Sequence, residues 1–197
     1  MVGGHSGRKP LVALMDESIL RAGNGVYLVG TVLIEERQKG TVRADLRRLV
    51  PPRHRFHFHA EQRRTRLAVM GLLAECAERS LVHRVSPAPQ RRHEASRRQC
   101  VAGLLADLRE ADVRELIIDS RDSHKPRNDL RDRSQILATI QAGRLPPELA
   151  YHHVHAGDEP LLWLADALAG AGLAAERGCR DYLDALPADR LVVRNTP

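Results

Sequence analysis

The sequence predicts a single α/β domain with a mixed sheet that is covered by helices on both faces. The chain has 197 residues, 43% of them hydrophobic and 28% charged, which is typical of one soluble globular domain. Two β-rich runs flank an Asn-Gly turn near the N-terminus, and this pattern indicates an antiparallel hairpin. Helical and strand patterns then alternate along the chain, which favours a sheet between two layers of helices.

The elements follow from local hydrophobic patterns. Short β-rich runs predict strands at 11–18, 26–34, 55–59, 81–85, 113–119 and 149–155. Apolar residues at helical spacing predict helices at 62–79, 91–110, 128–142 and 161–176. The third strand, Arg55–His59, alternates Phe with His and is expected to be short or at an edge. Asp158 is expected to be the N-cap of the last helix, with Glu159 and Pro160 in its opening turn.

The predicted organisation is a disordered N-terminus (1–10), one folded domain (11–180) and a C-terminal extension (181–197). The first residues have no apolar run after their basic residues, and the longest apolar stretch is too short to span a bilayer, so neither a signal peptide nor a membrane helix is indicated. The three cysteines form no CxxC pair, which argues against a disulfide framework or a zinc ribbon. A cytoplasmic protein is expected.

The charge of the chain is basic, and its aromatic content is low. The net charge is +6 at pH 7, and all but three of the 31 basic residues are Arg. This surplus fits contact with phosphates, and it fits coding bias equally well. Aromatic residues make up only 3% of the chain, so the composition disfavours a protein that holds single-stranded nucleic acid by stacking its bases.

Three carboxylates lie where burial makes a charge costly. Asp16 shares a face of the first strand with apolar residues, and Asp119 ends a later apolar strand. Asp166 is the one charged residue in the middle of the last helix, and Ala169 and Gly170 lie one turn further on the same face. Small residues at this spacing would let the helix approach the sheet closely.

Each carboxylate alone has a structural explanation. Asp16 or Asp119 would cap a turn at a strand end, and Asp166 would accept a hydrogen bond from a neighbouring Arg. Together, three carboxylates would repel one another unless a cation neutralised them. Mg²⁺ prefers oxygen ligands and keeps several waters, so the set suits Mg²⁺ or Mn²⁺. Two such ions can activate a water and stabilise the leaving oxygen of a phosphodiester.

Several segments carry a resemblance to a known family. They are M-D-E-S (15–18), Y-L-V-G-T-V-L-I (27–34), F-H-F-H-A-E (56–61), I-I-D (117–119) and L-L-W-L-A-D-A-L-A-G-A (161–171). In these motifs the chain resembles a family of domains of unknown function that is regarded as RNase H-like and is recognised by a D-E-S-G first strand and a late Q-L-A-D helix. Ile19 stands in place of the Gly and Trp163 in place of the Gln, and neither change removes a carboxylate.

The resemblance implies a fold and a set of site residues. It implies an RNase H-like domain whose catalytic, metal-binding carboxylates lie on the first strand, a later central strand and the final helix, at Asp16, Asp119 and Asp166. It further implies a Glu near the first helix, for which Glu61 is the candidate, although Glu61 also suits a helix N-terminus. His59 matches a His that precedes the first long helix of the family; it would orient a phosphate or water, or be an ordinary residue at a strand end.

Two basic segments are candidates for contact with a nucleic-acid backbone. The first is the loop after Asp119, with Arg121, Lys125 and Arg127. The second is the run Gln90–Arg98 (QRRHEASRR), which either binds phosphate or forms a solvated face.

The leading hypothesis is a nuclease that depends on Mg²⁺ or Mn²⁺ and hydrolyses phosphodiester bonds of DNA or RNA. The first alternative is a non-catalytic RNase H-like module that binds nucleic acid or a protein. A third, weaker alternative is a metal hydrolase of a small phosphorylated substrate.

Overall fold

The computed structural model describes residues 9–50, 55–121 and 127–196. Its strands form one mixed sheet with the order β5-β4-β1-β2-β3-β6. In chain order they are β1 (Leu11–Leu20), β2 (Val26–Glu35), β3 (Ala77–Val85), β4 (Val113–Asp119), β5 (Ala150–Val154) and β6 (Leu191–Asn195). The predicted mixed α/β sheet is therefore confirmed.

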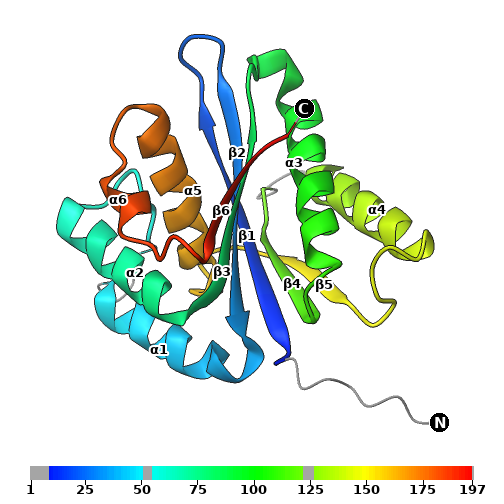
Figure 1. Cartoon of the computed structure of the whole chain (residues 1–197), viewed down its shortest axis with the longest axis horizontal. Helices are drawn as coiled ribbons and strands as arrows, with labels where there is room; N and C mark the ends of the chain where they lie inside the picture. The colour runs from blue at the N-terminus through cyan, green and yellow to red at the C-terminus, as the bar shows by residue number, and fades with distance from the viewer. Residues whose placement is uncertain (1–8, 51–54, 122–126, 197) are drawn as a thin grey trace.

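Helices cover both faces of this sheet (Figure 1). One layer holds α1 (Lys39–Leu49), α2 (Arg63–Cys76), α5 (Leu162–Glu176) and α6 (Asp181–Asp184). The other layer holds α3 (His93–Leu108) and α4 (Arg127–Gln141). Short 3₁₀ turns precede α1 and α3, at Glu36–Gln38 and Gln90–Arg92. None of the described helices is both long and apolar enough to cross a membrane.

The predicted hairpin forms with β1 and β2 antiparallel over their whole length, from Leu11 opposite Glu35 to Leu20 opposite Val26. The turn between them contains Gly23 and Gly25 at φ values of 61° and 74°. These are left-handed conformations that glycine adopts without a steric cost, so the Ala-Gly-Asn-Gly segment sets both the turn and the register.

The remaining pairings are parallel for β4, β5 and β6. Strand β4 pairs with β1, β5 with β4, and β6 with β3. Because β3 and β1 are both antiparallel to β2, the carboxyl ends of β1, β3, β4, β5 and β6 lie at one edge of the sheet. Ligands of open α/β sheets bind outside this edge.

Helix α5 is the central helix of its layer. Every residue from Leu162 to Leu173 is buried, because α5 packs on the sheet below and on α2 and α6 at its sides. The close approach to the sheet is present at Ala169, whereas Gly170 faces the ring of Phe58. A Cβ atom at Gly30 of β2 would lie 2.8 Å from the Ala169 nitrogen and 3.0 Å from the Ala165 oxygen, so only glycine fits beneath α5 here.

Three local predictions were wrong. Arg55–His59 forms no strand; Phe56 and Phe58 are buried, and a turn follows in which the N–H groups of Ala60 and Glu61 donate to the His57 carbonyl. The helix predicted at 62–79 ends at Cys76, and residues 77–79 belong to β3. Between β2 and Phe56, where no element was predicted, the chain forms α1, with Val42 and Leu46 buried.

The third wrong prediction concerns the start of α5. Asp158 does not cap it, since the helix begins after Leu161 with no side-chain bond from its N-cap residue. Glu159 accepts a hydrogen bond from the Leu161 N–H instead, at 3.1 Å, and is itself held by Arg43.

The structure describes the C-terminal segment of the chain more fully than the N-terminal one. Residues 1–8 of the predicted disordered N-terminus lie outside the described residues. The C-terminal segment 181–197 supplies α6, and it also supplies β6, whose residues Leu191–Asn195 pair with Ser80–Arg84 of β3.

Candidate active site

Three elements bring the predicted aspartates to the carboxyl edge of the sheet. Asp16 lies on β1 opposite Gly30, and Asp119 is the last residue of β4. The parallel register pairs Met15 with Ile118, so the next residue of each strand, an aspartate in both cases, lies at the same level. Asp166 reaches this level from α5, which crosses the face of the sheet above Gly30.

The fold holds each of the three carboxylates by a backbone N–H group. Asp16 Oδ1 accepts from Glu17 N at 2.6 Å, Asp119 Oδ1 accepts from Ala156 N at 2.7 Å, and Asp166 Oδ2 accepts from Phe58 N at 3.1 Å. Asp119 and Asp166 have side-chain exposures of 13% and 9%. The carboxylates are therefore oriented and largely withdrawn from solvent.

The three carboxylates act on one another electrostatically. Burial raises the pKa of Asp16 well above its ordinary value, and the negative charges of Asp166 and Asp119 raise it further. Burial also raises the pKa of Asp119, while the Ala156 N–H and the Arg55 charge lower it. Such mutual repulsion in a half-buried site is what a bound cation would relieve.

Two basic side chains face these carboxylates, Arg55, which the sequence did not single out, and His57, which the sequence suggested only as a disfavoured zinc ligand paired with His59. Arg55 Nη2 lies 3.4 Å from Asp119 Oδ2, and His57 Nδ1 lies 3.2 Å from Asp166 Oδ2. The hydrogen bond to Asp166 raises the pKa of His57. The sequence pattern that could have indicated them is the alternation R-F-H-F-H. Both Phe rings are buried, and Arg55 and His57, which alternate with them, contact the carboxylates.

Glu17 lies on the other face of the sheet from Asp16. It accepts hydrogen bonds from the Tyr27 hydroxyl and from Arg97, which belongs to α3. The expectation that neighbouring residues of a strand point to opposite faces holds here. Glu17 is therefore tied into the core beneath α3, and only its backbone N–H contributes to the site.

His59 and Glu61 lie in the turn before α2, and His59 contacts the strand that carries Asp16. His59 Nε2 lies 3.2 Å from Ser18 Oγ, which places the imidazole two residues beyond Asp16 along β1. Burial lowers the pKa of His59, and the charge of His57 lowers it further. Glu61 is half-buried, and its N–H donates to the His57 carbonyl. Its role as a fourth carboxylate stays a prediction.

The basic loop after Asp119 is only partly described. Arg121 faces the layer of α3 and α4, where its guanidinium lies 3.3 Å from Glu94 and 3.7 Å from Asp132. These partners use the Arg121 charge within the fold. Lys125 lies outside the described residues, and so does the side chain of Arg127.

The three aspartates offer the oxygen ligands that a hard cation prefers, although their side chains do not surround an ion as they stand. Carboxylate oxygens with raised pKa values at one edge of a sheet are typical ligands of Mg²⁺ and Mn²⁺. Within the described residues, no group of three or more His, Cys, Asp or Glu side chains is drawn together tightly enough to hold a metal as it stands. Binding would require the three aspartates to close on the ion.

Comparison with known proteins places the fold. No protein-family model matches the chain, and no curated protein matches it, so membership of the family of unknown function stays a prediction. Among solved structures, the PCNA:RNase HII complex from Archaeoglobus fulgidus matches with a TM-score of 0.53 and 18% identity, over 85% of this chain and 73% of that chain. Ribonuclease H2 from Pyrococcus horikoshii OT3 matches with a TM-score of 0.51 and 16% identity, over 91% and 82%.

These matches define the class of fold. The domain has an RNase H-like fold, as the resemblance implied. At 16–18% identity the likeness extends to the fold alone, so the chemistry must be argued from the residues of this chain.

Proposed function

We propose that this protein is a nuclease that depends on a divalent metal and hydrolyses phosphodiester bonds in nucleic acid. The observation that carries the proposal is the placement of three carboxylates at one level of the carboxyl edge of the sheet, with Asp16 and Asp119 on the neighbouring strands β1 and β4 and Asp166 on α5 above them. Buried like charges destabilise a fold, so a cluster of them indicates a functional site. The structural neighbours support the proposal, since their names identify them as ribonucleases of the same fold.

Each residue of the site has a role in this proposal. Asp16, Asp119 and Asp166 would hold Mg²⁺ or Mn²⁺, which supplies positive charge and a more acidic water when bound. The N–H groups of Glu17, Ala156 and Phe58 orient these carboxylates.

Basic side chains beside the carboxylates serve the substrate. Arg55 is half-exposed beside Asp119, where it can contact a phosphate of the backbone. His57 fixes Asp166, and His59 lies at the rim of the site on Ser18. The net charge of +6 favours the approach of a polyanion to the protein.

The test is hydrolysis of single-stranded DNA, RNA, double-stranded DNA and an RNA–DNA hybrid, each with Mg²⁺, Mn²⁺ or EDTA. We expect cleavage of at least one polymer with metal and none with EDTA. Asp16→Asn and Asp166→Asn are expected to abolish cleavage. Asp45→Asn, a carboxylate change on α1 away from the site, is expected to leave it intact.

Metal binding has a second readout that does not need a substrate. A ligand that binds only the folded state at about 100 times its dissociation constant stabilises that state by about 2.7 kcal/mol. We therefore expect Mg²⁺ or Mn²⁺ to raise the melting temperature of the wild type and not that of Asp16→Asn. Absence of cleavage across the panel, together with no stabilisation by metal, would contradict the proposal.

The pairing of Arg55 with Asp119 and of His57 with Asp166 favours a second candidate, a non-catalytic module that binds nucleic acid. In such a module the positive charges of Arg55 and His57, and not a metal ion, would balance the negative charge of the carboxylates. It predicts salt-sensitive binding that needs no metal and persists in Asp16→Asn and Asp166→Asn. A metal hydrolase of small substrates would instead act on nitrophenyl phosphates and on no polymer.

A further inference from the structure

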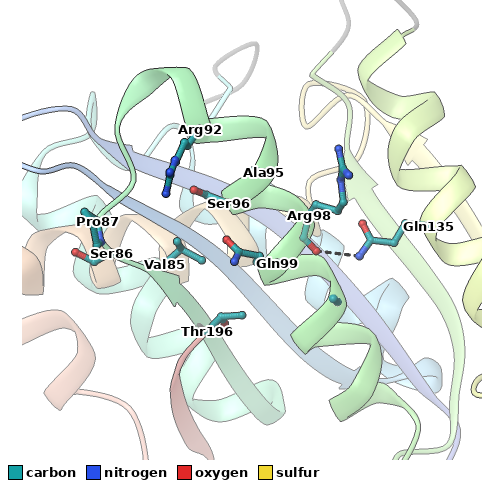
Figure 2. Close-up of a pocket in the computed structure, with 11 residues that line it drawn as sticks. Val85, Ser86, Pro87, Arg92, Ala95, Ser96, Arg98, Gln99, Gln135 and Thr196 are labelled. Carbon is teal, nitrogen blue, oxygen red and sulfur yellow. Dashed lines mark hydrogen bonds between the residues drawn. The ribbon is translucent and has the colours of Figure 1, made fainter.

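A pocket of about 720 Å³ lies on the face of the sheet opposite the three aspartates. The start of α3, the end of β3 and the residue after β6 form its walls (Figure 2). Val85 and Pro87 line it from β3 and the following turn, and Thr196 lines it from the C-terminal segment. The nuclease site and this pocket share no lining residue.

The charge of the pocket is positive. Arg92 and Arg98 line it, and no carboxylate belongs to its lining. Other arginines nearby are ion-paired, for example Arg97 with Asp132 and Arg131 with Glu94. Within the part of the chain that the structure describes, neither Arg92 nor Arg98 forms an ion pair. Arg98 also lines a neighbouring pocket together with Glu94 and Asp132, so the charge that favours an anionic ligand in this pocket is that of Arg92.

Helix α3 adds to this preference. Arg92 is its N-cap residue, and no side chain caps the helix start among the described residues. The N-terminal end of a helix carries a partial positive charge that favours phosphate. Here the N–H groups of Arg92 and His93 already donate to the preceding 3₁₀ turn and Glu94 lies in the first turn of α3, so Arg92 supplies the larger part of the attraction. Ser96, one turn into α3, is 2% exposed and lines the pocket together with Arg92 (Figure 2).

The shape of the pocket allows more than a phosphate. Ala95 and Ala102 leave space along the face of α3, and Val85 and Pro87 give an apolar wall. Pockets of about 300–1,000 Å³ hold small organic ligands or cofactors. A ligand that combines an anionic group, polar edges and a flat apolar ring matches these walls.

We propose that this pocket binds a nucleoside phosphate, with its phosphate on Arg92 and the start of α3 and its base against Val85 and Pro87. The chemistry is shared by a free mononucleotide and by the phosphorylated end of a nucleic-acid strand. The site is separate from the proposed nuclease site and does not depend on its activity. The proposal assigns a phosphate-binding role to the basic run Gln90–Arg98, for which the sequence left a solvated face as the alternative.

Calorimetric titration of the whole protein with 5′-AMP in EDTA tests the proposal, because EDTA removes metal-dependent binding at the aspartates. We expect saturable binding that Arg92→Ala weakens by about tenfold or more, since a charge-assisted arginine–phosphate contact is lost. Ala95→Leu, which fills the pocket, is expected to weaken it as well. Arg91→Ala is the matched control, because Arg91 is exposed, neighbours Arg92 and does not line the pocket.

Several results would overturn the proposal. They are no saturable binding of 5′-AMP at millimolar concentration, equal losses in Arg91→Ala and Arg92→Ala, or inorganic phosphate binding as tightly as 5′-AMP. Circular dichroism and melting of each variant separate lost binding from lost folding. Displacement of 5′-AMP by a 5′-phosphorylated oligonucleotide, and not by its 5′-hydroxyl form, identifies a strand end as the source. Binding of 5′-AMP without such displacement identifies the free nucleotide, and both results support the pocket.

Discussion

Arg97 on α3 and Asp132 on α4 form a buried ion pair behind β1. The Nη2–Oδ2 distance is 2.7 Å, and the two residues are 1% and 3% exposed. Arg97 also donates to Glu17 of β1, and His153 of β5 lies 3.4 Å from Asp132. The pair therefore ties two helices to the carboxyl ends of two strands, directly behind Asp16.

Removing the arginine should destabilise the fold strongly. Arg97→Ala leaves Glu17 without its arginine and leaves Asp132 with only the more distant Arg121 and with His153, and breaking one partner of a buried pair costs about 3–5 kcal/mol. Urea unfolding followed by circular dichroism measures this loss. Arg98→Ala, an exposed neighbour on the same helix, should change the free energy of unfolding by no more than about 0.5 kcal/mol. Similar losses in both variants would contradict the assigned role of the pair.

The same pair should make stability depend on acidity. Burial alone would raise the pKa of Asp132, but hydrogen bonds from His153 and Arg97 outweigh it and hold the pKa well below its usual range. The unfolded-state pKa of Asp is about 3.9. The contribution of Asp132 is thus complete above about pH 4 and is lost as the pH falls towards the folded-state pKa. The stability gap between the wild type and Asp132→Asn should narrow on acidification below about pH 4, and a constant gap would contradict this linkage.

The carboxylates of the candidate site should have the opposite effect on stability. Because Asp119 and Asp166 repel the charge of Asp16, Asp16→Asn should raise the melting temperature in EDTA at neutral pH. Each kcal/mol of repulsion that the substitution removes should raise the melting temperature by about 2–4 °C in a domain of this size. Asp45→Asn on exposed α1 serves as the control and should leave the melting temperature almost unchanged. A lower melting temperature for Asp16→Asn would mean that the carboxylate stabilises the fold.

Gly30 should determine how closely α5 packs on the sheet. In Gly30→Ala the new Cβ would meet backbone atoms of Ala165 and Ala169, so α5 and its Asp166 must shift. Overpacking of this kind costs about 1–3 kcal/mol. Gly71→Ala in α2 meets nothing within 4 Å and should instead stabilise by about 0.4–1 kcal/mol. Equal effects of the two substitutions in urea unfolding would argue against a fixed position of α5.

Elements with strong local signals were predictable from the sequence. The Asn-Gly turn set the β1–β2 hairpin, and the strand ending at Asp119 has the predicted bounds 113–119. The small residues of α5 predicted its approach to the sheet, which Gly30 completes. In each case the pattern lies within a few residues, so no distant contact was needed to interpret it.

Features that depend on distant contacts were not predictable. The alternation of Arg55–His59 is typical of a strand, but the segment is not part of the sheet among the described residues, and it lies against Asp119 and Asp166 instead. The partner of Arg97 lies 35 residues away on another helix. The nucleotide pocket joins β3, α3 and the C-terminal segment, which no single stretch of sequence connects.

The topology of β1 also determines when the candidate site can form. Its hairpin with β2 forms from neighbouring residues, but its other partner begins with Val113 opposite Leu11, and Asp166 follows still later. Closing such long loops costs chain entropy and slows folding. During synthesis the hairpin is therefore complete long before the third carboxylate has left the ribosome. The nascent chain must hold its central strand half-paired until the last part of the domain arrives.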